Sequence, residues 1–473
     1  MDGILIFYIG IEYIQGTFFD NLGTEKITIK KPIKLYCDEE IIEQNPEEWF
    51  NTVVEIIKEI GSSNPNLNIN SISVTYEPGT LIFVDRCGNH LMNAILPWDK
   101  RAKYQSRMCE KIVRKHNDTI YIPWGYMTLP KILYIKYNKP DIYRKVFKIL
   151  TPDGYIAYRL CGETAVDNYS AAFLGYNLKT CVYNSKLLAN LGIDIKLLPE
   201  VCKPGKRIGM ISGEMKDDLG LKSDVQFLIS SNSFMSLSTF SYNSEEITLF
   251  FDADSSRICF ICNTFKTKKD SEMIRLPYNN AYIYGYMGNY EARFLKWLND
   301  ITDKPIIKIT NYSPGSRGLM IIPCIMGDSL YNNFDLKSSI IGINNNNIED
   351  LITANYEAIG YIFKEKLDKI IANVALIDSI EVLSSINDEI FYHILSDITT
   401  KNIKISNKCF NCVNGIYNLI YNIKNEDNHD KKLIESNEER NYIYKQFTNL
   451  YKSAYTALNN VYRYRTRIMK KLI

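Results

Sequence analysis

Apolar residues alternate with polar or small ones near the start of the chain, in the stretch 5–23. The alternation is interrupted at Ile14–Gly16 and resumes through Thr17–Phe19 into Asp20. This pattern predicts a β-hairpin whose second strand is closed by Asn21–Gly23. Because the first strand is almost wholly apolar, we expect the hairpin to lie in a buried sheet.

Helical periodicity appears in several later stretches. Asn45 as N-cap and Pro46 at the first helical position predict an amphipathic helix that runs to Gly61. Long helices are predicted at 350–371 and 442–470, the first of them with one apolar face. Between these regions the composition turns polar at 242–246, which marks the expected boundary between two domains, 1–243 and 244–473.

The overall charge is nearly balanced, with 56 basic and 54 acidic residues and a formal charge of +2. We therefore find no electrostatic argument for a nucleic acid or an anionic membrane as a partner. One local basic cluster lies at 463–471. It is interpreted either as a patch for a nucleic acid or another partner, or as a solvated last helical turn whose cations complement the helix dipole.

The eleven cysteines show no disulfide-scaffold spacing, which predicts reduced and mostly buried thiols. The Cys-x-x-Cys pairs at 259–262 and 409–412 can be combined into a zinc site. The first pair lies in a strand-like run, where positions i and i+3 face opposite sides, so we expect no metal there. Asp2 stands where a signal peptide carries a basic residue, and the apolar run 4–11 is too short to span a bilayer, so we expect a cytoplasmic protein.

Several stretches resemble sugar kinases of the FGGY family in their xylulokinase-like form. Gly10–Glu12 and Phe18–Asp20 stand at the two ends of the family's first hairpin, and 72–102, 129–212 and 318–330 match later segments. The resemblance covers nearly the whole chain. It implies an α/β protein of two ribonuclease-H-like domains of the actin and hexokinase type, with a cleft between a sugar-side domain and a nucleotide-side domain.

The resemblance implies that a sugar is bound at 77–79, where xylulokinase-like members carry Gln-Met-His. This chain has Glu77, Pro78 and Gly79. The Glu77 carboxylate can accept hydrogen bonds from a polyol, whereas Pro78 and Gly79 offer no side-chain donor. Asp99 and Arg101 also fall on matching positions, where they form either a polar contact at the cleft or a surface ion pair of little energetic value.

The family's general base is an aspartate that follows a strand and begins a helix. Asn232 stands at that position, with Ser230 and Ser231 in place of glycines. An amide cannot take a proton at neutral pH, so we interpret Asn232 as the N-cap of the following helix. If the alignment is shifted, a nearby acid can serve as the base, and the candidates are Asp224, Asp252 and Asp254.

The family's phosphate and adenosine loops are also altered. The first phosphate loop is shortened to the residues after Glu12, and the second keeps only two hydroxyls while Asp254 adds negative charge near a triphosphate. A divalent-cation site at Asp252 and Asp254 lacks an evident third ligand, so an ordinary turn is the alternative. ATP with Mg²⁺ is the cofactor that the family implies, and the positions expected to contact it are Glu12, Ser255, Ser256, Ser384, Ser385 and Gly415.

Ile386 stands where the family has glycines that let the backbone approach adenosine, so we expect its branched side chain to obstruct the nucleotide. The leading hypothesis is a catalytically impaired pseudokinase that binds a ligand or regulates a partner protein. The alternative is an active ATP-dependent sugar or polyol kinase, and a third hypothesis is a structural role in an assembly. A homodimer through the second domain follows only from the resemblance.

Overall fold

The fold was analysed in a computed structural model of the chain. It divides into two compact units, which are described separately. Unit 1 contains Met1–Phe240, Arg275–Pro277 and Phe410–Asn425, and unit 2 contains Ser241–Ile274, Tyr278–Cys409 and Glu426–Ile473. The structure describes residues 1–38, 40–97, 99–116, 124–241, 247–252, 257–264, 274–278, 281–288, 293–302, 309–324, 335–372, 377, 379–406, 411–423 and 431–472. The boundary expected at 243/244 stays a prediction.

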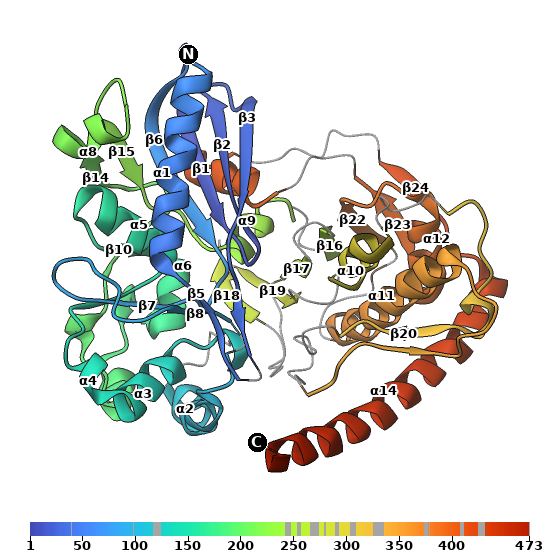
Figure 1. Cartoon of the computed structure of the whole chain (residues 1–473). Helices are drawn as coiled ribbons and strands as arrows, with labels where there is room; N and C mark the ends of the chain where they lie inside the picture. The colour runs from blue at the N-terminus through green and yellow to red at the C-terminus, as the bar shows by residue number, and fades with distance from the viewer. Residues whose placement is uncertain are drawn as a thin grey trace. The chain divides into compact units, whose positions relative to one another are not determined.

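Unit 1 is built around a six-stranded sheet with the order β3-β2-β1-β6-β15-β14 (Figure 1). The pairs β1/β6 and β6/β15 are parallel, and β3/β2, β2/β1 and β15/β14 are antiparallel. Both central strands, β1 and β6, are almost entirely buried, as their apolar sequences require. The strands are β1 (Asp2–Ile9), β2 (Tyr13–Asp20), β3 (Glu25–Pro32), β6 (Asn68–Tyr76), β14 (Arg207–Ile211) and β15 (Val225–Leu228).

The N-terminal hairpin is confirmed, but the predicted position of its turn is wrong. The strands β1 and β2 pair through Ile9 and Ile14, and the Gly10 N–H donates to the Tyr13 carbonyl at 3.0 Å. The interruption seen at 14–16 therefore lies inside β2, where Gly16 packs against the Ile56 side chain and leaves no room for a Cβ. A small residue that accommodates a neighbouring helix was mistaken for a turn.

The first helix follows its sequence signals closely. It is α1 (Pro46–Ser63), and the Asn45 side chain accepts a hydrogen bond from the Glu47 N–H at 2.9 Å. The other helices of unit 1 are α2 (Lys103–His116), α3 (Leu129–Asn138), α4 (Pro140–Tyr143), α5 (Pro152–Cys161), α6 (Asn168–Ala171), α7 (Ser185–Leu191), α8 (Gly213–Asp218), α9 (Ser233–Ser238) and α13 (Cys412–Tyr421).

Short strand pairs extend unit 1 beyond the main sheet. They are β4 (Tyr36–Cys37), β5 (Ile42–Gln44) and β8 (Ala94–Ile95) in one sheet, β7 (Ile82–Val84) with β9 (Lys148–Leu150), β10 (Ala165–Asp167) with β13 (Glu200–Cys202), and β11 (Tyr176–Asn177) with β12 (Val182–Tyr183).

The main sheet of unit 2 repeats the strand order of unit 1, as β19-β17-β16-β22-β23-β24. The directions repeat as well, because β16/β22 and β22/β23 are parallel and the remaining pairs of that series are antiparallel. The strands are β16 (Ile247–Asp252), β17 (Arg257–Thr264), β19 (Ala281–Gly288), β22 (Ser379–Ser384), β23 (Asn402–Ile405) and β24 (Lys432–Ile434), with β20 (Met320–Ile322) and β21 (Ser339–Ile341) forming a separate pair. A further strand, β18 (Ile274–Tyr278), has its three central residues in unit 1.

Four helices of unit 2 are described: α10 (Arg293–Thr302), α11 (Ile348–Ile371), α12 (Glu389–Thr399) and α14 (Glu438–Leu472). The two long helices predicted from the sequence are thus confirmed, and α11 begins with a capping box between Asn347 and Asp350. In the described part of the chain, no helix is both long and apolar enough to cross a membrane. Unit 1 and unit 2 therefore have the same α/β arrangement, the ribonuclease-H-like fold that was expected twice.

Candidate functional site

Asn232 is completely buried where β15 leads into α9. Its side-chain oxygen accepts a hydrogen bond from the Met235 N–H at 3.3 Å, and its Nδ2 donates to the Ser170 Oγ at 2.9 Å. The predicted helix N-cap is confirmed, and the amide also ties α9 to α6. Both halves of this side chain have structural partners, and neither half can act as a proton acceptor for a substrate hydroxyl.

Two buried aspartates lie close to Asn232, and sequence reasoning did not single them out as site residues. Asp167 Oδ1 accepts hydrogen bonds from the Tyr169 N–H, the Ser170 N–H and the Ser231 Oγ at 2.9, 3.1 and 2.8 Å. Asp153 Oδ1 accepts from the Thr151 Oγ1 at 2.6 Å and the Gly154 N–H at 2.9 Å. The second oxygen of each carboxyl is buried without a hydrogen-bond partner among the described residues.

Burial determines the protonation of this pair. Burial and, second, the nearby Asp167 carboxylate raise the pKa of Asp153 to about 8. Burial also raises the pKa of Asp167 to about 6, against the hydrogen bonds that stabilise its charged form. The same burial, together with both carboxylates, raises the pKa of the Tyr76 hydroxyl well above its usual value. At neutral pH, Asp153 is therefore mostly protonated.

Glu77 lies directly after the buried end of β6 and is only 3% exposed. Its Oε1 accepts a hydrogen bond from the Tyr8 hydroxyl at 2.5 Å. Gly79 has a φ of +84°, and a Cβ there would meet the Tyr126 carbonyl oxygen at 2.6 Å. This position therefore requires glycine for backbone reasons.

Lys131 on α3 is a third residue that the sequence did not reveal. Its buried Nζ donates to the Gly79 carbonyl at 2.7 Å and to the Leu96 carbonyl at 2.8 Å. Burial lowers the pKa of this amine to about 7. Lys131 thereby connects the segment of Glu77 with the segment that leads to Asp99, and an apolar helix pattern gives no signal for such a contact.

Asp99 and Arg101 form a buried ion pair, whereas the alternative of a polar contact at the cleft stays a prediction. The Arg101 Nη2 lies 2.7 Å from Asp99 Oδ2 and 2.6 Å from Glu43 Oε1, with only 9% of the Arg101 side chain exposed. Asp99 also accepts the Ile42 N–H at 3.0 Å. The surface-pair alternative is wrong, because both groups are enclosed and matched to partners within unit 1.

The turn between β1 and β2 contains Glu12, one of the positions predicted to contact the nucleotide. The Gln44 Nε2 donates to the carbonyl oxygens of Gly10 and Ile11 at 3.3 and 2.7 Å. The Glu12 carbonyl accepts the Ile33 N–H at 3.0 Å. The turn thus directs carbonyl oxygens at its neighbours, whereas a phosphate needs a cradle of N–H donors.

In unit 2, Ser384 and Ser385 line a cavity of about 310 Å³ at the end of β22. The cavity is also bordered by Asn387, Asp388 and Lys432. Ile386 also lines this cavity, and it is 5% exposed and belongs to the hydrophobic core of this unit. The expected obstruction of a nucleotide by its side chain stays a prediction. Ser255 and Ser256, together with Asp254, lie outside the described residues.

Gly415 does not lie at this cavity. It is in α13 of unit 1, where a Cβ would meet the Ser236 carbonyl oxygen at 2.3 Å. The Ser236 Oγ also donates to the Cys412 carbonyl at 2.5 Å. Gly415 is therefore explained by the close packing of α13 on α9, and its proposed contact with a nucleotide has no support in the residues around it.

Of the alternative bases, Asp224 lies in the same unit as Asn232. Asp224 precedes β15, so it lies at the opposite end of this strand from Asn232. Its carboxylate lies 3.8 Å from the Lys216 amine. Asp252 ends β16 in unit 2. No group of three or more metal-binding side chains occurs in the described part of the chain, and Cys409 lies outside it.

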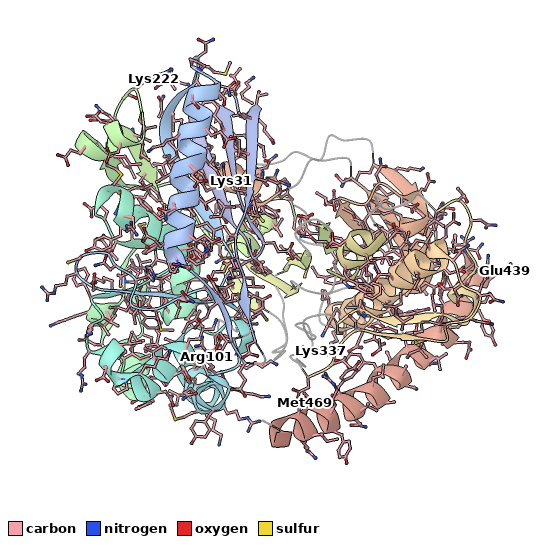
Figure 2. The ribbon with its side chains drawn as sticks, in the orientation of Figure 1. Lys31, Arg101, Lys222, Lys337, Glu439 and Met469 are labelled. Atoms are coloured by element: carbon pink, nitrogen blue, oxygen red, sulfur yellow. The ribbon has the colours of Figure 1, made fainter. Side chains whose placement is uncertain are left out.

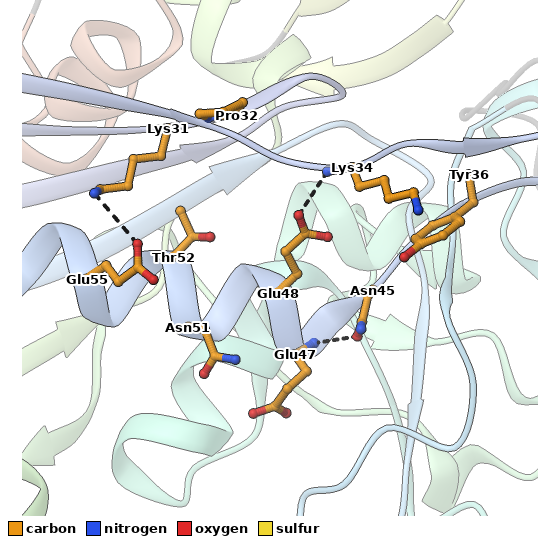
Figure 3. Close-up of a pocket in the computed structure, with 10 residues that line it drawn as sticks. All are labelled: Lys31, Pro32, Lys34, Tyr36, Asn45, Glu47, Glu48, Asn51, Thr52 and Glu55. Atoms are coloured by element: carbon orange, nitrogen blue, oxygen red, sulfur yellow. Dashed lines mark hydrogen bonds and ion pairs between the residues drawn. The ribbon is translucent and has the colours of Figure 1, made fainter.

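A larger groove of about 650 Å³ lies on unit 1 between β3 and the start of α1 (Figure 3). None of the site residues predicted from the sequence lines it. Within it, the Lys31 amine lies 3.6 Å from the Glu55 carboxylate, and the Glu48 carboxylate accepts a hydrogen bond from the Lys34 backbone N–H at 2.9 Å.

The known proteins to which this chain is similar are carbohydrate kinases. Residues 5–235 match the FGGY family of carbohydrate kinases, N-terminal domain. The chain is 25% identical over 343 residues to the xylulose kinase of Staphylococcus xylosus, with 69% of this chain and 70% of that protein covered. It is 29% identical over 222 residues to a xylulose kinase of Staphylococcus epidermidis, with 46% and 44% covered.

Solved structures extend the similarity over the whole fold. A ligand-bound xylulose kinase from Lactobacillus acidophilus superposes with a TM-score of 0.82 at 19% identity, covering 98% of this chain and 99% of that one. A gluconate kinase from the same organism gives 0.81 at 20% identity, with the same coverage. Plasmodium falciparum glycerol kinase with ADP gives 0.76 at 17% identity, covering 97% and 98%. At these identities the structural similarity establishes the fold alone.

Proposed function

We propose that the chain is a catalytically impaired member of the FGGY family of carbohydrate kinases, a pseudokinase that serves as a ligand-binding or regulatory module. The observation that carries this proposal is Asn232. The residue at the position of the family's base is an amide, fully buried and hydrogen-bonded on both sides.

The loss of a positioned base removes a large part of the rate. General base catalysis contributes typically about 10²–10⁴-fold, or roughly 3–5 kcal/mol of activation free energy. Asp167, the carboxyl closest in the hydrogen-bond network, is completely buried and accepts three hydrogen bonds on one oxygen. It is held too tightly to approach a substrate hydroxyl directly.

The turn at Gly10–Glu12 supports the same proposal from the phosphate side. The Gln44 side chain donates hydrogen bonds to the carbonyl oxygens of this turn. A phosphate placed there would find few N–H donors, and each missing hydrogen bond to its charge costs about 1.5–3 kcal/mol of binding free energy. A triphosphate held with fewer donors is bound more weakly and is less well aligned for transfer.

The unit 2 cavity supports the ligand-binding part of the proposal. Its lining combines hydroxyl, amide, carboxylate and amine groups from Ser384, Ser385, Asn387, Asp388 and Lys432. A volume of about 310 Å³ is at the lower end for a small-molecule site. The same cavity and the buried Glu77 favour the second candidate, an active ATP-dependent sugar or polyol kinase whose substrate is bound by a carboxylate.

Calorimetric titration with Mg·ATP, followed by an ADP-release assay over a panel of pentoses, hexonates and polyols, tests the proposal. We expect no sugar-dependent ADP release from the purified protein. Asn232→Asp is expected to create measurable turnover if the base is the main missing part. Asn184→Asp, which changes another N-cap of unit 1, is the matched control and should create none. Sugar-dependent turnover by the unmodified protein at rates typical of kinases would establish the active-kinase alternative instead.

A further inference from the structure

The last helix, α14, carries two apolar stripes, of which one is packed. Tyr444 and Tyr451 are 0% and 5% exposed and belong to the hydrophobic core of unit 2. Phe447, Leu458 and Tyr462 pack against the same core. This inner stripe fixes the helix on unit 2.

The second stripe faces solvent. Its members recur at helical spacing and lie on one side of α14, roughly a quarter of a turn from the inner stripe. Exposed apolar side chains gathered on one side of a helix, as at Val461, Tyr464 and Ile468, can mark an interaction site. The residues of this outer stripe, with their exposed fractions, are Ile443 (40%), Leu450 (55%), Val461 (58%), Tyr464 (67%) and Ile468 (43%).

Charge is strongly segregated along the same helix. Glu439 is the last acidic residue of the sequence, and it lies near the start of α14, while Met469 lies near the end (Figure 2). From residue 440 onward there are eight basic residues and no acidic one, in a chain with 56 basic and 54 acidic residues. Arg463, Arg465 and Arg467 are exposed, and none of them forms an ion pair with a described residue.

We propose that the C-terminal half of α14 binds an anionic lipid surface. The arginines at 463, 465 and 467 would contact the phosphate headgroups, while Val461, Tyr464 and Ile468 would enter the interfacial layer. A helix that lies in the plane of the interface needs this combination of an apolar stripe with basic flanks. A nucleic acid would use the arginines but leave the aliphatic side chains in water.

A membrane-binding helix differs from the expectation based on the total charge of the chain, which gave no reason for attraction to an anionic membrane. A formal charge of +2 predicts no attraction to an anionic membrane when it is spread over the surface. Electrostatic attraction to a lipid surface acts within about a Debye length, roughly 8–10 Å, so the local charge of the contacting helix decides. The acidic residues that balance the total lie elsewhere in the chain.

Vesicle flotation of the full chain tests the proposal. We expect binding to vesicles of phosphatidylcholine mixed with phosphatidylglycerol, little binding to phosphatidylcholine alone, and weakening with added salt. Replacing Arg463, Arg465 and Arg467 together by Gln should weaken binding to the vesicles on the order of a hundredfold. Each basic residue near the lipid surface contributes a similar favourable free energy of binding, so the three losses add. Val461→Ser with Ile468→Ser should weaken binding while the charge is kept.

The matched control replaces three exposed lysines of unit 1, Lys179, Lys186 and Lys203, by Gln and so removes the same charge. It should bind like the unmodified chain, and circular dichroism should show all variants folded. Absence of binding to anionic vesicles at low salt, or equal loss in the control, would overturn the proposal. Two other results would also overturn it. One is a dimer in sedimentation velocity that the combined substitutions Val461→Ser and Ile468→Ser dissociate, with no binding to vesicles. The other is binding of RNA that depends on the arginines alone.

Discussion

The two units have the same strand order, yet Glu357 of unit 2 and the pair Asp153 and Asp167 of unit 1 are buried with different hydrogen bonding. In unit 2, Glu357 accepts the Gly315 N–H at 2.7 Å and the Tyr444 hydroxyl at 3.0 Å on one oxygen, and the Ser316 Oγ at 2.9 Å on the other. In unit 1, Asp153 and Asp167 each use one oxygen, and the other has no partner among the described residues.

This difference separates a fully hydrogen-bonded buried carboxyl from two that are only half hydrogen-bonded. Glu357 connects α11 with α14 and with the loop before β20, so its cost of burial is offset by specific hydrogen bonds. A buried carboxyl with only one hydrogen-bonded oxygen contributes less to stability. Such groups in native proteins often belong to catalytic or binding sites. The polar surroundings of Asn232 thus contain two carboxyl oxygens that have no hydrogen-bond partner among the described residues.

The largest expected effect comes from Glu357→Leu. The substitution leaves three buried donors without an acceptor, so we expect unit 2 to lose about 3 kcal/mol or more of stability. Hydrogen exchange of peptides from α11 and α14 would measure it without interference from unit 1. Glu365→Gln, on the same helix, is the control and should change stability by less than about 0.5 kcal/mol. An equally small effect of Glu357→Leu would show that the two units do not differ in this way.

The pH dependence of unit 1 should be governed by Asp153. Its pKa is about 8 in the folded protein and 3.8 ordinarily, so the folded state holds a proton that the unfolded state releases between these values. Stability therefore falls as pH rises through this window, and Asp167 adds to the fall up to about pH 6. Asp153→Asn should remove about 2 kcal/mol of the decline between about pH 5 and pH 7 in urea unfolding. An unchanged pH profile would contradict the assignment.

Lys131→Met should destabilise unit 1 by about 2 kcal/mol, because the carbonyls of Gly79 and Leu96 lose their donor. The Lys131 pKa is lowered from 10.5 to about 7, so the contribution of the amine to stability grows as pH rises from about 7 toward 10.5. The deficit of the variant should therefore be larger at about pH 9 than at pH 7. Lys145→Met, at an exposed position, is the control, and a pH-independent deficit would argue against a depressed pKa.

The smallest effects sharpen the comparison by testing what the units share. Asn184 in unit 1 and Asn347 in unit 2 both cap helices through their side-chain oxygens, at 3.0 and 2.9 Å from the capped N–H groups. Replacing either by Ala should cost about 1 kcal/mol in thermal unfolding. If both substitutions lower stability by a similar amount, the units differ in their buried carboxyls and not in their helix caps. If only one substitution lowers stability, the units differ in overall stability.

Much of the fold could be predicted because its signals are local. Asn45 and Pro46 begin α1, and the apolar stretch at the N-terminus forms β1 and β2, since caps and alternation act within a few residues. The exact turn was misplaced because Gly16 serves the packing of α1, a contact that the sequence does not show.

The candidate site could be predicted only in part. Asn232 was identified with its capping role, because a cap is also a local feature. The contacts of Lys131 with Gly79 and of Ser231 with Asp167 join residues that are 52 and 64 positions apart. Such contacts depend on the arrangement of elements in space, and a single sequence gives no signal for them.

The placement of α13 has a consequence for synthesis on the ribosome. This helix is made late in the chain, yet it completes unit 1 through the contact of Gly415 with Ser236 and the packing of Tyr417 on Phe19. The first 240 residues therefore emerge without the partner that covers α9. We expect unit 1 to wait for most of unit 2 to be translated before it closes, so that a nascent chain stalled before residue 412 would still expose α9 to proteases and chaperones.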